Sequence, residues 1–203
     1  MLRSSSRKPN GGRIKVPSRH VLLSLVFVFL LPGALRADEV ALIYGQGPQA
    51  GSQQRNRVLG LEYAFYTFER SDRQHLQVGV AYTRLRTNAA SFNEMYVVSV
   101  FPQLTFYPPA TGSLALSMPQ GLQPFFYARI LGPAYISATA LGERRQARHF
   151  AFHAQIGTGV VFESRRGHKL IAHVSWRHLS NANLDSPNDG IDVPLVLTFG
   201  IRY

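Results

Sequence analysis

The 203-residue sequence contains no cysteine, one tryptophan and few acidic residues. Without cysteine, disulfides, thiolate metal sites and a lipidated-cysteine anchor are excluded. The 11 acids stand against 22 lysines and arginines, a formal net charge of +11. Seven of these cations and none of the acids lie in residues 1–37, so residues 38–203 carry 15 cations against 11 acids, a net charge of +4. So small an excess does not support a nucleic-acid-binding surface.

The sequence also lacks the run of about 20 apolar residues that a transmembrane helix needs. Its longest apolar stretch, 21–31, follows a basic region and precedes Pro32, Gly33 and Ala34. This order is typical of a secretory signal peptide, which we expect to span residues 1–37. Leu35 is an imperfect cleavage-site residue, so an uncleaved anchor stays an alternative. The remaining 166 residues, 38–203, suit one domain.

Along residues 38–203, apolar and polar residues alternate with the period of two that is typical of β-strands. In residues 150–162 the even positions are mostly apolar, whereas the odd positions include His153, Gln155, Gly157 and Gly159. Small and polar side chains would then fill a barrel interior while apolar ones meet lipid. Residues 108–121, rich in Pro and Gly, are expected to form a loop. Eight strands are predicted at 40–44, 57–70, 74–86, 95–107, 123–140, 149–165, 169–178 and 194–203.

The last predicted strand ends the chain on an aromatic residue, Tyr203, with apolar residues at every second position from Leu195. This ending is similar to the assembly signal of bacterial outer-membrane barrels. Other aromatic residues near predicted strand ends are Tyr96, Tyr107, Phe125 and Tyr127. A soluble β-sandwich is the alternative, but it rarely combines these features with a signal peptide and an even strand count. We therefore predict an all-β fold, an eight-stranded antiparallel transmembrane β-barrel of the bacterial outer membrane.

His178 and Ser180 share parity with the apolar residues of the strand that ends there, including Val174 and Trp176. Residues two apart on a strand point the same way, roughly 6–7 Å apart, and slight bending would bring them into hydrogen-bond reach. A base beside a hydroxyl nucleophile on a lipid-facing surface would act on lipid. With both termini in the periplasm, the seventh strand ends on the extracellular side, in the leaflet that holds lipopolysaccharide. An ordinary polar strand end is the alternative.

The sequence His-Leu-Ser-Asn-Ala at 178–182, followed by Pro-Asn-Asp-Gly-Ile at 187–191, resembles the active-site segment of the PagL-type lipid A 3-O-deacylases. These are eight-stranded outer-membrane esterases. The resemblance implies hydrolysis of the acyl ester at the 3 position of a lipid A glucosamine, without metal or cofactor. By position it implies Ser180 as nucleophile, His178 as its base and Asp192 as the acid that orients the imidazole.

The family normally has Glu where Asp192 stands, and Asp is shorter by about one carbon–carbon bond, roughly 1.5 Å. The backbone must then approach more closely, or His178 is less well oriented. Counted from Leu195, parity places Asp192 on the opposite face, but the neighbouring Gly and Pro argue against regular strand geometry there. Asp185 and Asp189 are rival acids that we expect to be turn residues.

An oxyanion would need hydrogen-bond donors near Ser180. The family pattern suggests Asn188, and the backbone N–H groups near Ala182 and Asn183 are further candidates. Asn183 stands where the family tends to have Gly. Loop capping is the alternative role for these asparagines.

Two other groups of residues have mainly structural interpretations. His149 and His153 share parity with neither an obvious carboxylate nor a third histidine nearby, so no metal site is expected. Several arginines could hold lipid phosphates, although surface charge at strand ends is the better explanation for most of them. They are Arg84, Arg86, Arg144, Arg145 and Arg148.

We therefore expect a serine esterase that remodels lipid A in the outer leaflet. The alternatives are a non-catalytic barrel for adhesion or envelope stability, and an outer-membrane phospholipase or acyltransferase. Expected partners are the lipid A or lipopolysaccharide substrate, outer-membrane lipid and the outer-membrane assembly machinery, but no nucleic acid. A homodimer stays open, and no cofactor is expected.

Overall fold

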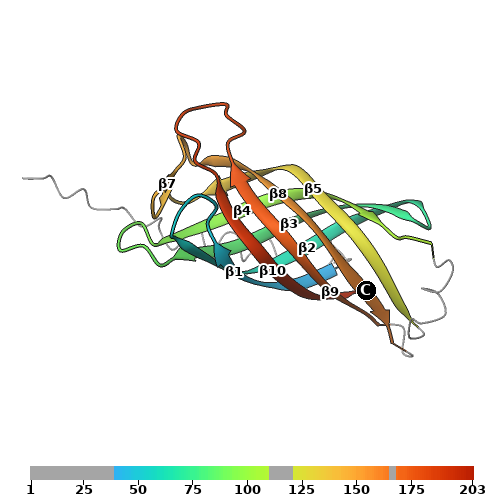
Figure 1. Ribbon diagram of the computed structural model, residues 1–203. Coiled ribbons are helices and arrows are strands. Elements are labelled where there is room, and N and C mark those ends of the chain that lie inside the picture. The colour runs from blue at the N-terminus through green and yellow to red at the C-terminus, as the bar shows by residue number, and fades with distance from the viewer. Residues whose placement is uncertain (1–38, 110–120, 165–167) are drawn as a thin grey trace, which may run out of the picture. The chain divides into compact units, whose positions relative to one another are not determined.

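The computed structural model describes residues 39–109, 121–164 and 168–203. Eight strands form one closed antiparallel barrel in the order β1-β10-β9-β8-β5-β4-β3-β2 (Figure 1). The barrel strands are β1 (Glu39–Pro48), β2 (Arg55–Ser71), β3 (Gln74–Thr87), β4 (Glu94–Phe106), β5 (Leu122–Ile136), β8 (Phe150–Glu163), β9 (Lys169–Ser180) and β10 (Ile191–Arg202). The predicted all-β barrel is confirmed. The predicted signal peptide and residues 110–120 of the predicted loop lie outside the described residues.

Three strand boundaries differ from the sequence prediction by three residues or more. β1 continues to Pro48, and β10 begins at Ile191 instead of 194. The strand predicted over 123–140 ends at Ile136, and the chain then forms a separate hairpin of β6 (Ala140–Leu141) and β7 (Arg144–Arg145). Gly142, at φ 59°, provides the left-handed residue of its turn, a conformation that glycine adopts without strain.

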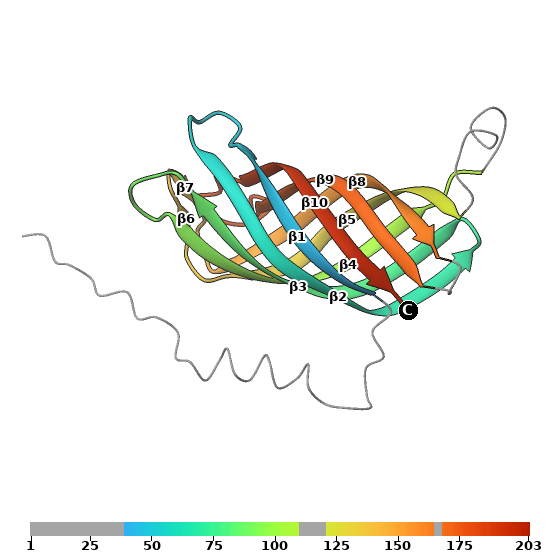
Figure 2. The ribbon, with the colours of Figure 1, turned by 90° about the horizontal axis from the view of Figure 1, so that it is seen from below.

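One end of the barrel carries this hairpin and the connections 49–54, 88–93 and 181–190; we call it the loop end. The C-terminus lies at the opposite end (Figure 2). This arrangement follows from antiparallel pairing, because alternate connections meet at the same end. The loop end therefore holds the end of β9 and the start of β10, where the candidate residues stand.

The outer surface of the barrel is apolar. Side chains alternate between buried and exposed along each barrel strand, as the period of two predicted. Large exposed apolar side chains come from every barrel strand, for example Leu42, Leu61, Leu76, Val100, Phe126, Ile156, Val174 and Phe199. Such a surface is that of a transmembrane barrel. Within residues 39–109, 121–164 and 168–203, no helix is long and apolar enough to cross a membrane.

The interior is packed in three layers instead of being uniformly polar. Near the loop end lies an apolar cluster that includes Ile43, Leu85 and Leu141 of the β6–β7 hairpin. The middle layer is a buried ionic cluster around Glu62. The third layer contains Tyr107, Phe125, Tyr127, Val161 and Ile171.

Three of the four aromatic residues noted near predicted strand ends are interior residues. Tyr107, Phe125 and Tyr127 are 2–3% exposed, whereas Tyr96 is 38% exposed and lies on the outside. The reason is alternation: each of the three occupies a position whose strand neighbours face lipid, as Phe126 does at 56% exposure. A small barrel needs such side chains to fill its interior.

Candidate active site

His178 and Asp192 are direct partners across the β9–β10 pair on the outer face of the barrel. The imidazole Nδ1 lies 2.8 Å from the Asp192 Oδ1. The two side chains are 29% and 14% exposed, so the pair is partly shielded but reachable. Because an ionised carboxylate only accepts hydrogen bonds, this contact places a proton on Nδ1, and Nε2 is the nitrogen that carries the lone pair in the neutral imidazole.

A β-bulge in β10 brings Asp192 to this face. The register between β10 and β9 shifts by one residue between Val193 and Val196, a segment that includes Pro194. Proline, which has no N–H to donate, is tolerated at such irregularities, and one extra residue reverses the face that each preceding position occupies. If strand positions are counted back from Leu195 without the bulge, Asp192 falls on the inner face. With it, Asp192 lies beside His178, and this direct pairing lets the shorter acid reach the imidazole.

The imidazole of His178 is also contacted by Trp176 and Gly190. The indole of Trp176 stacks on it with ring centroids 5.4 Å apart and an interplanar angle of 21°. Gly190, at φ 59°, approaches so closely that a Cβ there would lie 2.8 Å from His178 Cε1. The orientation of the His178 ring is therefore set by the Asp192 carboxylate at Nδ1, the indole face of Trp176 and the backbone of Gly190.

Ser180 follows His178 by two positions and lies on the same half-exposed outer face, as predicted. The expected hydrogen bond between them is not formed, and within the described residues Ser180 Oγ has no hydrogen-bond partner. Catalytic hydrogen bonds are often long in the absence of substrate and shorten in the complex. The structure thus brings Asp192 and His178 into contact and leaves Ser180 beside them.

The loop that follows β9 is tied together by Asn188. The Asn181 backbone N–H donates to Asn188 Oδ1 at 2.9 Å, and Asn188 Nδ2 donates to Asn183 Oδ1 at 2.8 Å. Ala182 and Asn183 have φ of 55° and 60°, which bends the chain sharply after Asn181. Capping by Asn188 is therefore observed, and its amide retains a second hydrogen for another acceptor. Its oxyanion role stays a prediction, as do those of Ala182 and Asn183.

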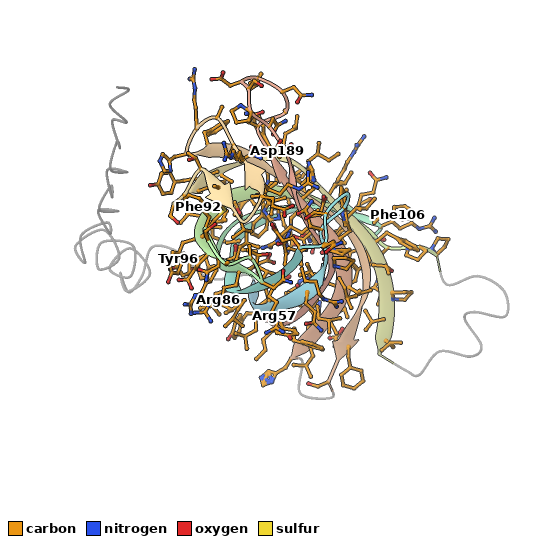
Figure 3. The ribbon with its side chains drawn as sticks, turned by 60° about the vertical axis from the view of Figure 1, so that its left-hand side comes forward. Arg57, Arg86, Phe92, Tyr96, Phe106 and Asp189 are labelled. Atoms are coloured by element: carbon orange, nitrogen blue, oxygen red, sulfur yellow. The ribbon has the colours of Figure 1, made fainter. Side chains whose placement is uncertain are left out.

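The two rival acids are engaged elsewhere. Asp185 lies 2.6 Å from Arg148 and accepts a hydrogen bond from the Ser186 backbone N–H. Asp189, on the loop before β10 (Figure 3), accepts from the Arg145 backbone N–H at 2.8 Å and so fastens this loop to the β6–β7 hairpin. Of the three candidate acids, Asp192 is the one that reaches His178.

Three buried amides behind Asp192 were missed by the sequence analysis. Gln49, Asn56 and Gln54 are 2%, 0% and 5% exposed and come from the β1–β2 connection and the start of β2. Gln49 Nε2 donates to Asp192 Oδ2 at 2.9 Å, and the Asp192 backbone N–H donates to Gln49 Oε1 at 2.9 Å. Polar residues in a loop are ordinarily exposed, so their type and spacing gave no signal of this contact.

The other residues considered in the sequence, His153, Arg84 and Arg86, make contacts within the protein that stabilise the fold. His153 is 1% exposed and hydrogen-bonds to Ser99 inside the barrel, and the described part of the chain contains no group of metal-ligating side chains. Arg84 and Arg86 share the carboxylate of Glu94. Figure 3 shows Arg86 well apart from Asp189, so this ion-paired group is distant from the candidate site.

Comparisons with known proteins bear on the family and the fold of this chain. A family model described as lipid A 3-O-deacylase (PagL) matches residues 44–202. The crystal structure of the outer membrane enzyme PagL has a TM-score of 0.57 to this chain at 22% identity, covering 81% of this chain and 99% of that one, which shows a common fold. That of the outer membrane protein OprG from Pseudomonas aeruginosa has a TM-score of 0.38 at 11% identity, covering 84% and 98%. None of the curated proteins compared matches.

The family match spans nearly all the described residues and includes His178, Ser180 and Asp192. The resemblance found in the short segment after β9 is therefore confirmed over the whole barrel, and this chain belongs to the PagL family of lipid A 3-O-deacylases.

Proposed function

We propose that this protein is an outer-membrane serine esterase that removes the 3-O-linked acyl chain of lipid A from the outer leaflet. The observation that carries the proposal is the 2.8 Å contact between Asp192 and His178 on the apolar outer face, next to Ser180. An imidazole oriented by a carboxylate and a nearby hydroxyl are the parts of a serine esterase. Their position on the outside of the barrel suits a lipid substrate.

In the proposed reaction, His178 Nε2 takes the proton of Ser180 as Oγ attacks the acyl carbonyl carbon. The Asp192 carboxylate stabilises the imidazolium that forms. When the tetrahedral intermediate collapses, the ester C–O bond breaks and His178 returns the proton to the departing sugar oxygen. A water molecule, deprotonated by the same imidazole, then releases the fatty acid from Ser180.

The developing oxyanion needs donors that are already in place. Asn188 suits this role because its position is fixed by Asn181 and Asn183 and one amide hydrogen stays free. The backbone N–H groups of Ala182 and Asn183 are the next candidates, since among the described residues no acceptor is bonded to either.

Substrate access is proposed from the lipid side. The interior is filled by packed layers, and even a Cβ at inward-facing Gly157 would lie 2.4 Å from the Val174 carbonyl oxygen. Val174 and Trp176, by contrast, are 38% and 41% exposed on the same face as His178. The acyl chain would lie along these residues with the loop end directed toward the cell exterior.

Purified protein in vesicles containing lipid A provides the test. We expect loss of one ester-linked acyl chain by mass spectrometry, and labelling of the wild-type protein by a serine-directed fluorophosphonate. Ser180→Ala and His178→Ala should each leave a folded, heat-modifiable barrel with turnover reduced by several orders of magnitude. Near-normal deacylation by folded Ser180→Ala would refute the serine mechanism, and inactivity of the wild-type protein would favour a non-catalytic barrel.

A further inference from the structure

Asp192, the acid of the candidate triad, is held by hydrogen bonds at its backbone as well as at its carboxylate. Besides its two bonds with Gln49, Asp192 accepts a hydrogen bond at its backbone carbonyl from Asn56 Nδ2, at 2.8 Å. Asn56 Nδ2 also donates to Gln49 Oε1 at 2.7 Å. The side chain, N–H and C=O of Asp192 are thus each fixed by one of two buried amides.

The orientation of these amides follows from their partners. Gln49 must direct Nε2 to the Asp192 carboxylate, which only accepts, and Oε1 to a backbone N–H, which only donates. Asn56 is fixed in turn, because its Nδ2 meets a backbone carbonyl. If the Gln49 amide were turned over, its Oε1 would face the Asp192 carboxylate, an acceptor, and its Nε2 would face the Asp192 N–H, a donor. The arrangement therefore requires an amide at position 49 and a hydrogen-bond-accepting oxygen on Asp192.

We propose that Gln49 is a positioning residue that orients Asp192 toward His178. This inference rests on the proposed function. With Oδ2 held by Gln49, Oδ1 is the oxygen that faces His178 Nδ1. The β1–β2 connection thereby contributes to the site, although it lies more than a hundred residues from His178 in the sequence.

Packing of the loop end is the alternative role for this network, and the chain offers a matched control. Gln54 is also a buried glutamine of the same connection, and it bonds to Asn56 Oδ1, the Leu141 carbonyl and the Glu143 N–H. It does not contact Asp192. Loss of Gln54 should therefore weaken the loop end without releasing the acid.

The experiment compares Gln49→Met with Gln54→Met, since methionine keeps the length of glutamine without its hydrogen bonds. Lipid A deacylation is measured per folded molecule, with the folded fraction taken from unheated gels. We expect Gln49→Met to lower kcat by about 10- to 100-fold with little change in KM, the size of effect that slight misplacement of a catalytic group produces. Gln54→Met should lower stability comparably and leave kcat within about 2-fold of wild type. Equal kcat in the two variants would overturn the proposal.

Gln49→Glu tests the donor with almost no change of shape. One oxygen can still accept from the Asp192 N–H, but the other would face the Asp192 carboxylate as a second acceptor. We expect kcat to fall at least as far as in Gln49→Met. If Glu at this position supports full turnover, the donor is not required and Gln49 only fills space.

A double-mutant cycle separates positioning from a general structural role. If Gln49 acts through Asp192, Gln49→Met should have no further effect on kcat, within about 2-fold, once Asp192→Asn is present. Additive losses would show that Gln49 acts elsewhere. Activity of folded Ser180→Ala would instead refute the proposed function itself, so the two failures are distinguishable.

Discussion

Glu62, inside the barrel, and Asp192, on its outer face, are both carboxylates held by a nitrogen-bearing side chain. Glu62, 4% exposed, binds Arg129 through both oxygens and lies 3.3 Å from Arg177 Nη2. Asp192, 14% exposed, meets His178 on the outer face. Both are fixed by further buried groups: Arg129 lies 3.8 Å over the Phe101 ring, and Asp192 bonds to Gln49.

The difference between them is access. Each partner of Glu62 is 2% exposed within the packed interior, so this cluster can contribute only to folding. His178 is 29% exposed and keeps a ring nitrogen free beside a half-exposed serine. An acid–base pair therefore indicates chemistry only where an atom of the base stays open to a substrate, and this barrel meets that condition on its lipid-facing side.

Asp192→Asn should give the largest effect and sharpen this contrast. The amide carries no charge and can stabilise the wrong tautomer of His178, which costs a serine triad about 10⁴-fold in kcat. Deacylation kinetics with vesicle-embedded protein provide the measurement. Asp185→Asn and Asp189→Asn are the matched controls, because their carboxylates bond to Arg148 and the hairpin instead of His178. Small and equal losses in all three would remove Asp192 from the triad.

Glu62→Gln should have the opposite profile. Two buried guanidiniums would lose the charge that compensates them, and breaking a buried pair in this way costs about 3–5 kcal/mol of stability. Urea titration of the folded barrel, followed by gel mobility without heating, measures that loss. Activity per folded molecule should stay within about 2-fold of wild type. A folded Glu62→Gln protein without activity would show that the interior cluster takes part in catalysis.

Much of the fold could be predicted from the sequence because the two faces of a strand appear directly as an alternation of apolar and polar residues. The alternation along β8 and β9 predicted their outer faces correctly, and the resemblance of the segment 178–191 pointed to His178, Ser180 and Asp192 as candidate residues. Alternation alone does not say which aromatic residues near strand ends point inward, as Tyr107, Phe125 and Tyr127 do.

The contacts that shape the site could not be predicted in the same way. The bulge before Val196 depends on how β10 pairs with β9, and pairing register is not a property of either strand alone. Gln49 reaches Asp192 only because barrel closure places β1 beside β10. Both are long-range consequences of topology, whereas the Ser-His spacing is local.

Gly190→Ala should have an intermediate effect, on the outer site alone. A Cβ there would lie 2.8 Å from His178 Cε1, and alanine at φ 59° is strained by roughly 1–2 kcal/mol. We expect kcat to fall about 10- to 100-fold because the added Cβ displaces the imidazole from the position in which Asp192 holds it. The matched control is Gly51→Ala, a loop-end glycine with φ 69° whose Cβ would meet only Arg144, at 3.4 Å. Similar losses of kcat in the two variants would mean that backbone strain, and not contact with the imidazole, is responsible.

The smallest expected effect concerns the path of the substrate. Val174 and Val100 are both outward-facing valines, 38% and 42% exposed. Val174 lies on β9, on the same face as His178, and Val100 lies on β4, three strands away around the barrel. Aspartate at either position places a charge against lipid. A Lys or Arg at the bilayer midplane costs about 2–4 kcal/mol of stability, and an acid costs less. Val174→Asp alone should also raise KM, by about 3- to 10-fold, because weakening one apolar contact of the acyl chain is worth about 1 kcal/mol. The measurement is deacylation in lipid A vesicles, normalised to the folded fraction. If both variants raise KM equally, or neither does, the acyl chain does not lie along β9 and the lipid-side approach is wrong.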